Sequence, residues 1–156
     1  MIAFFSVGSS KEFAMSDLLL VGLNPESKQG EEYFLHCMDW WYEIVMVLQQ
    51  QLEGRFAFDE HFKRDMMLAL PTPTMGEEDC KELGKLVSEM VRDGSAEAQL
   101  ERIYREDPFL MQAQEEDPEG LHLDPTHRLE QIRALAIFLD QCGGCKAKWH
   151  GLEDSQ

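Results

Sequence analysis

The residues DPTHRLEQIRALAIFLDQCGGC, 124–145, give the clearest indication of the fold. Asp124-Pro125 is a helix cap followed by proline at the first helical position, where the missing amide hydrogen has no intrahelical partner to lose. The helix that follows is apolar on nearly every side between Ala134 and Leu139, which indicates that neighbours cover it all round. Gly143 then stands where a glycine commonly ends a helix. The stretch therefore predicts a central helix.

Apolar residues recur at helical spacing in five further stretches. The strongest runs from residue 34 to residue 52 and stops at Gly54, and the others cover residues 10–21, 59–70, 76–93 and 95–105. Residues 1–7 and 18–23 could instead be short strands, but other alternating patterns are scarce. We therefore predict an all-α fold, a compact bundle of five to seven helices with a nearly all-apolar central C-terminal helix.

Length and composition fit one helical domain over residues 1–156. Hydrophobic residues make up 44 % of the chain, which is enough apolar material for a core despite the charge. Residues 1–9 and 151–156 are candidates for disorder, and residues 106–124 for an acidic connecting segment. No stretch is long and apolar enough to span a bilayer, and no secretory signal is evident. We therefore expect a cytoplasmic protein with reduced thiols.

The acidic excess is the strongest indication of function. Thirty acidic residues against 14 basic ones give a formal net charge of −16. Such a surface is repelled by phosphate backbones and by anionic lipid, so we expect neither direct nucleic-acid binding nor membrane contact. It attracts basic surfaces on other proteins and speeds encounter with them. We therefore expect a basic protein surface as the partner, although the same acidity also serves solubility alone.

The acids gather most clearly between residues 106 and 127, which include no lysine or arginine. Much of this segment has loop composition, so it predicts either an acidic docking edge or a mobile, solvated loop. Trp40, in the run Trp40-Trp41-Tyr42, is the candidate aromatic anchor because aromatic side chains dominate interfaces. The alternative is that these rings serve the core on two sides. The candidate partner-binding residues are Glu106, Asp107, Glu115, Glu116, Asp117, Glu119, Asp124 and Trp40.

Cys142-Gly-Gly-Cys145 is the sharpest local motif. With His150 it offers three metal ligands, and a closed zinc site would need a fourth from His36, Cys37, Cys80 or His127. The alternative is a glycine-rich helix cap with two incidental thiols. A redox pair is disfavoured because the motif follows a helix C-terminus, where the dipole raises the pKa of a thiol. Zinc is thus the one cofactor that the motif suggests.

Residues 124–130, DPTHRLE, followed by an apolar helix, are similar to the acidic-Pro-x-Asp-His-Leu signature of molybdoenzyme assembly chaperones. The resemblance covers about a dozen residues and implies an acidic, all-helical, cytoplasmic assembly factor. No nucleotide-binding loop or nucleophile elbow occurs, so we predict no catalytic residues and do not expect an enzyme.

These observations predict a small acidic accessory factor that binds a basic protein partner as an assembly chaperone, accessory subunit or regulator. A homodimer is compatible with the apolar excess on the helices. Two other classes stay open. One is a nucleic-acid-mimicking inhibitor of a nuclease or a DNA- or RNA-binding complex, as some phage-encoded anti-defence proteins are. The other is a metal or thiol protein that uses the CGGC segment.

Overall fold

The computed structural model describes residues 17–36, 38–62, 74–108, 111, 112, 115 and 125–150. Within these ranges the fold is mostly helical, with five α-helices, and it also has a four-stranded antiparallel sheet. The helical prediction is confirmed, and the prediction of an all-α bundle is wrong because of the sheet. The two candidate disordered ends and most of the acidic connecting segment lie outside the described residues.

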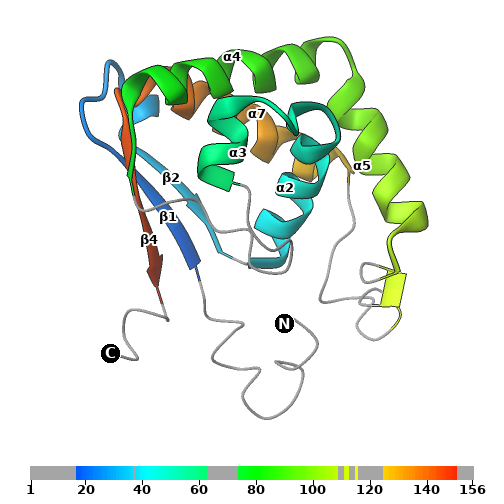
Figure 1. Cartoon of the computed structure of the whole chain (residues 1–156). Coiled ribbons are helices and arrows are strands. Elements are labelled where there is room, and N and C mark those ends of the chain that lie inside the picture. The colour runs from blue at the N-terminus through cyan, green and yellow to red at the C-terminus, as the bar shows by residue number, and fades with distance from the viewer. Residues whose placement is uncertain are drawn as a thin grey trace.

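The sheet has the strand order β2-β1-β4-β3, and all neighbouring strands are antiparallel (Figure 1). The strands are β1 Asp17–Gly22, β2 Glu32–Leu35, β3 Thr74–Met75 and β4 Cys145–His150. Leu18 and Leu20 of β1 and Tyr33 and Leu35 of β2 are buried, and the residues between them are more exposed. This alternation is the period of two that a strand with one covered face requires.

The helices fall within or overlap the predicted segments except residues 10–21, where the prediction of a helix is wrong: residues 17–22 form β1, close to the short strand left open at 18–23. The helices are α2 Met38–Leu52, α3 Phe56–Phe62, α4 Glu77–Arg92, α5 Ser95–Glu106 and α7 Pro125–Gln141, with a 3-10 turn, η2, at Lys28–Gly30. The helix α2 begins later than predicted, because residues 32–35 pair with β1. At the start of α5, the carboxylate of Asp93 accepts the backbone amide of Ser95 at 2.8 Å, so Asp93 satisfies the first amide of the helix.

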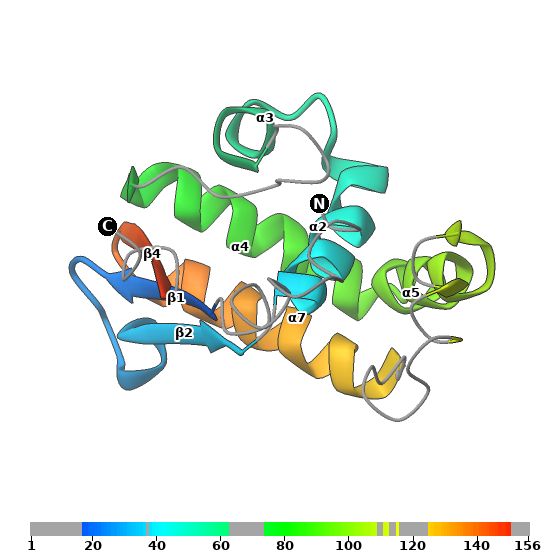
Figure 2. The same ribbon diagram turned by 90° about the horizontal axis from the view of Figure 1, so that it is seen from below.

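The helices cover one face of the sheet, and α4 runs alongside α7 in both views (Figures 1 and 2). The central position predicted for α7 is confirmed, since this helix contacts α2, α4, α5, β2 and η2. Its side chains Ile132, Leu135, Phe138 and Leu139 are buried. Ile137 stays 38 % exposed, so the burial is not all round.

The C-terminal end of α7 is fixed by the loop that follows β1. Backbone amides of residues 23, 24 and 26 donate to the carbonyl oxygens of residues 144, 142 and 141, at 2.8, 3.0 and 2.7 Å. Lys81 Nζ donates to the carbonyl of Asp140 at 2.9 Å. Gly143 has a φ of 65°, and a Cβ there would lie 2.2 Å from the carbonyl oxygen of Asn24. The CGGC turn is therefore held in one conformation, which fixes the direction of its cysteines.

Candidate metal centre and binding surface

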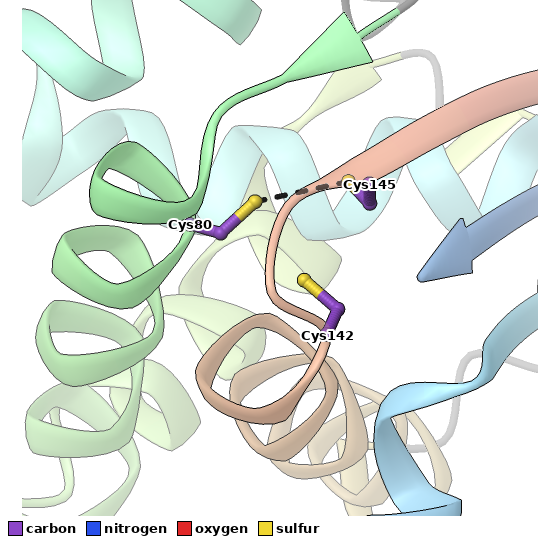
Figure 3. Close-up of side chains that lie close together, drawn as sticks. All are labelled: Cys80, Cys142 and Cys145. Carbon is purple, nitrogen blue, oxygen red and sulfur yellow. Dashed lines mark hydrogen bonds between the residues drawn. The ribbon is translucent and has the colours of Figure 1, made fainter. Parts of the chain in front are cut away.

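Three cysteine side chains meet where the first turn of α4, the end of α7 and the start of β4 come together (Figure 3). They are Cys80, Cys142 and Cys145, all free thiols and each at most 1 % exposed. Their three Sγ atoms lie within 4.8 Å of one another. The sulfurs of Cys80 and Cys145 are 3.8 Å apart. We call this group the thiol cluster.

The thiol cluster favours one negative charge and resists further ones. The neighbouring thiols of Cys145 and Cys80 lower the pKa of Cys142, and the backbone at Gly144 lowers it further. The hydrogen bond to Cys142 raises the pKa of Cys80 to about 12 and also raises that of Cys145, and burial adds to both shifts. Three thiolates would therefore coexist here when a cation offsets their charge.

The structure brings two of the three predicted metal ligands together and replaces the third. Cys142 and Cys145 are joined by Cys80, which the sequence offered as one of four possible fourth ligands. His150 lies at the far end of β4, opposite Asp17, five residues beyond Cys145. A strand rises about 3.3 Å per residue, so the two backbone positions are about 16 Å apart. Among the described residues, no His, Asp or Glu belongs to the cluster.

The other candidate ligands lie elsewhere. His36 is exposed just after β2, and His127 is exposed in the first turn of α7. Cys37 is outside the described residues. The thiol cluster is thus a set of three sulfurs, the donor type that soft cations prefer.

A second feature is a row of four rings, Phe34, His36, Trp40 and His127, which we call the aromatic row. Successive ring centroids are 4.7, 6.3 and 5.6 Å apart, each in an edge-to-face arrangement. Phe34 is 42 % exposed, both histidines are exposed and Trp40 is half-buried. The row combines side chains of β2, α2 and α7 in one surface feature.

A buried polar network supports the aromatic row from inside. The guanidinium carbon of Arg128 lies 5.0 Å from the ring centroid of Trp40. Arg128 Nε donates to Glu43 Oε1 at 2.7 Å, and neither side chain is exposed at all. Tyr104 donates its hydroxyl to the same oxygen at 2.6 Å, and Arg128 Nη1 donates to Gln131 Oε1 at 2.7 Å. This network connects α2, α5 and α7 and holds the guanidinium group against the indole ring.

The acidic candidates are only partly described. Glu106 and Glu115 are exposed, and Asp107 is half-buried with its Oδ2 3.5 Å from the hydroxyl of Tyr42. Glu116, Asp117, Glu119 and Asp124 lie outside the described residues. Apart from Trp40, the aromatic row was not predicted, because Phe34 was assigned to the apolar face of a helix. The buried pair had one signal, the charge of Glu43 in an otherwise apolar run.

No known protein family matches this chain, and neither the curated proteins nor the solved structures include a significant match. Within the described ranges, every helix is too short or too polar to cross a bilayer.

Proposed function

We propose that this protein is a small acidic accessory factor that binds a basic surface of another protein through the aromatic row. The observation that supports this proposal best is the row itself. It presents one indole, one phenyl ring and two imidazoles at the surface of a molecule with a net charge of −16. Tryptophan is the residue type most enriched among side chains that dominate binding energies.

The support beneath Trp40 adds to this argument. A hot-spot ring contributes most when its conformation is fixed before binding, because less side-chain entropy is then lost. Trp40 contacts the buried Arg128 on one side and His127 and His36 at its edges. Glu32 lies two residues before Phe34 on the same face of β2 and is exposed, so negative charge borders the row at that end. A basic partner with an apolar or cationic side chain for the indole would complement it.

Affinity purification of the tagged full chain at low salt tests the proposal. Phe34→Ser with His127→Ala removes two exposed rings of the row and leaves Trp40 and the buried network in place. The matched control is Phe56→Ser, since Phe56 is 70 % exposed at the start of α3, outside the row. We expect a stoichiometric partner that high salt releases, that the double variant loses and that the control retains.

The class of the captured partner decides between the functions that the acidity allows. A biosynthetic enzyme or its subunit would identify an assembly factor or accessory subunit, and a nuclease or DNA-binding protein would identify a mimic of nucleic acid. Equal capture by the double variant, or elution of the protein alone or as a homodimer at all salt concentrations, would contradict binding through the aromatic row.

A further inference from the structure

The sulfur atoms of the thiol cluster lie closer together than the burial of three small apolar side chains requires. Free cysteine often behaves as a small hydrophobic residue in a core, and packing alone would set no distance between sulfurs. Here the three sulfur atoms face one another within 4.8 Å, although Cys80 is 62 and 65 residues away from the other two in sequence. The fold thus brings α4, the end of α7 and the start of β4 together so that their cysteine sulfurs are neighbours.

We propose that Cys80, Cys142 and Cys145 bind one Zn²⁺ ion as a three-thiolate site. Zinc binds thiolate at about 2.3 Å in tetrahedral geometry, so two sulfur ligands lie about 3.8 Å apart. The Cys80 and Cys145 sulfurs already have that separation, 3.8 Å. Binding releases the protons of the three thiols to solvent.

The surroundings of the thiol cluster suit a thiolate site of this kind. Backbone contacts orient two of the sulfurs, because the thiol of Cys142 donates to the carbonyl oxygen of Leu139 at 3.5 Å and that of Cys80 to the carbonyl oxygen of Met75 at 3.9 Å. The turn that carries Cys142 and Cys145 is fixed by the three hydrogen bonds from residues 23, 24 and 26. The ligand directions are therefore set before the metal arrives, which reduces the entropy lost on binding.

Three thiolates also suit zinc in charge. With Zn²⁺ the site carries one net negative charge, whereas a monovalent soft cation such as Cu⁺ would leave two in a buried position. The described residues contribute three ligands, and we assign the fourth tetrahedral position to a water molecule or another small ligand. Filled, the site would connect α4, the end of α7 and β4, so zinc would stabilise the junction between the helices and the sheet.

Titration of the reduced, metal-free full chain tests the site directly. Co²⁺ is the probe, because thiolate ligation gives intense charge-transfer bands and tetrahedral geometry gives strong ligand-field bands. We expect both to saturate at one equivalent, to disappear when Zn²⁺ displaces Co²⁺, and to be accompanied by a rise in the thermal midpoint. Metal analysis of protein purified without added metal should find zinc at close to one equivalent.

Single replacements separate ligation from folding. Cys80→Ser, Cys142→Ser and Cys145→Ser should each lose stoichiometric binding. Cys37→Ser makes the same chemical change in the remaining cysteine and should bind as the parent does. Val87→Ala removes a fully buried side chain from α4 and should lower stability while it preserves binding. If the three cluster variants fail to fold, the titration of the parent chain still decides.

Absence of the thiolate–cobalt bands in the reduced parent chain would overturn the proposal and leave the three thiols as core side chains. Retained binding in the cluster variants, loss of binding in Cys37→Ser, or stoichiometric copper in place of zinc would overturn it as well. None of these outcomes bears on the aromatic row, so the proposal of a metal site and the proposal of a partner-binding surface are tested independently.

Discussion

Glu43 and Arg128 form an ion pair that is fully removed from water, which makes each charge depend on the other. Arg128→Met leaves the Glu43 carboxylate buried without its counter-charge, and we expect a loss of about 3–5 kcal/mol in the free energy of unfolding. Glu43→Leu together with Arg128→Met removes both charges and should lose much less than the sum of the single changes. Urea unfolding of the two single variants and the double variant measures this coupling.

Arg133→Met is the control for the buried pair, since Arg133 lies on the same helix but is exposed. It should change the free energy of unfolding by about 0.5 kcal/mol or less. Additive effects of Glu43→Leu and Arg128→Met would contradict the inference that the two charges act as a unit.

Two buried tyrosine hydroxyls make stability depend on alkaline pH: Tyr104 donates to Glu43 in the network, and Tyr33 donates to the backbone carbonyl of Gln131 at 2.8 Å. Burial raises the pKa of Tyr33 and, with the negative charge of Glu43 as second cause, that of Tyr104. Their contribution to stability is complete below the ordinary tyrosine pKa of about 10 and falls as the pH rises beyond it, because the unfolded state releases the proton first. Tyr33→Phe with Tyr104→Phe should flatten the decline in unfolding free energy above that pH. An unchanged slope would show that other groups cause it.

At the scale of elements, the contact between α4 and α7 depends on Gly84. A Cβ at this position would lie 2.9 Å from the amide nitrogen of Asp140 and 3.0 Å from the carbonyl oxygen of Ala136. Both are backbone atoms, so Gly84→Ala must separate the helices. Overpacking costs about 1–3 kcal/mol and the gain in helix propensity is about 1 kcal/mol, so we expect a net loss of up to about 2 kcal/mol by urea unfolding.

Ser88→Ala is the control for Gly84→Ala, because Ser88 is exposed one turn further along α4. It should raise stability by a few tenths of a kcal/mol, since alanine has the higher helix propensity. A stabilised Gly84→Ala variant would show that α4 and α7 can move apart at no cost.

The helices could be predicted because each repeats its apolar period over several turns, and α7 also carries proline and glycine at its ends. The sheet could be predicted only at β1, where residues 18–23 were left open as a short strand. β1, β2 and β4 have six, four and six residues, too few to distinguish a period of two from a helical one. The thiol cluster and the aromatic row were also predicted only in part, because both depend on contacts between elements that are distant in sequence. The CGGC motif was visible, but its third thiol depends on how α4 packs beside α7, and the aromatic row depends on β2 being a strand.

At the scale of the whole molecule, the charge of −16 acts on the fold and on any partner in opposite directions. Like charges on one compact chain repel each other, and salt screens that repulsion because the Debye length falls from about 30 Å at 0.01 M to about 10 Å at 0.1 M. We therefore expect sodium chloride to raise the thermal midpoint by roughly 2–4 °C over this range, equivalent to about 1 kcal/mol for a chain of this size.

Two charge reversals at exposed positions, Glu53→Lys and Glu130→Lys, should flatten this dependence on salt. The same screening should weaken capture of a basic partner, because it removes the attraction that speeds encounter. Stability that rises with salt while partner binding falls would show that one surface charge causes both effects. A thermal midpoint that is independent of salt in the parent chain would mean that repulsion between the acidic side chains does not destabilise the folded state. Partner binding would then be the remaining effect of the charge to measure.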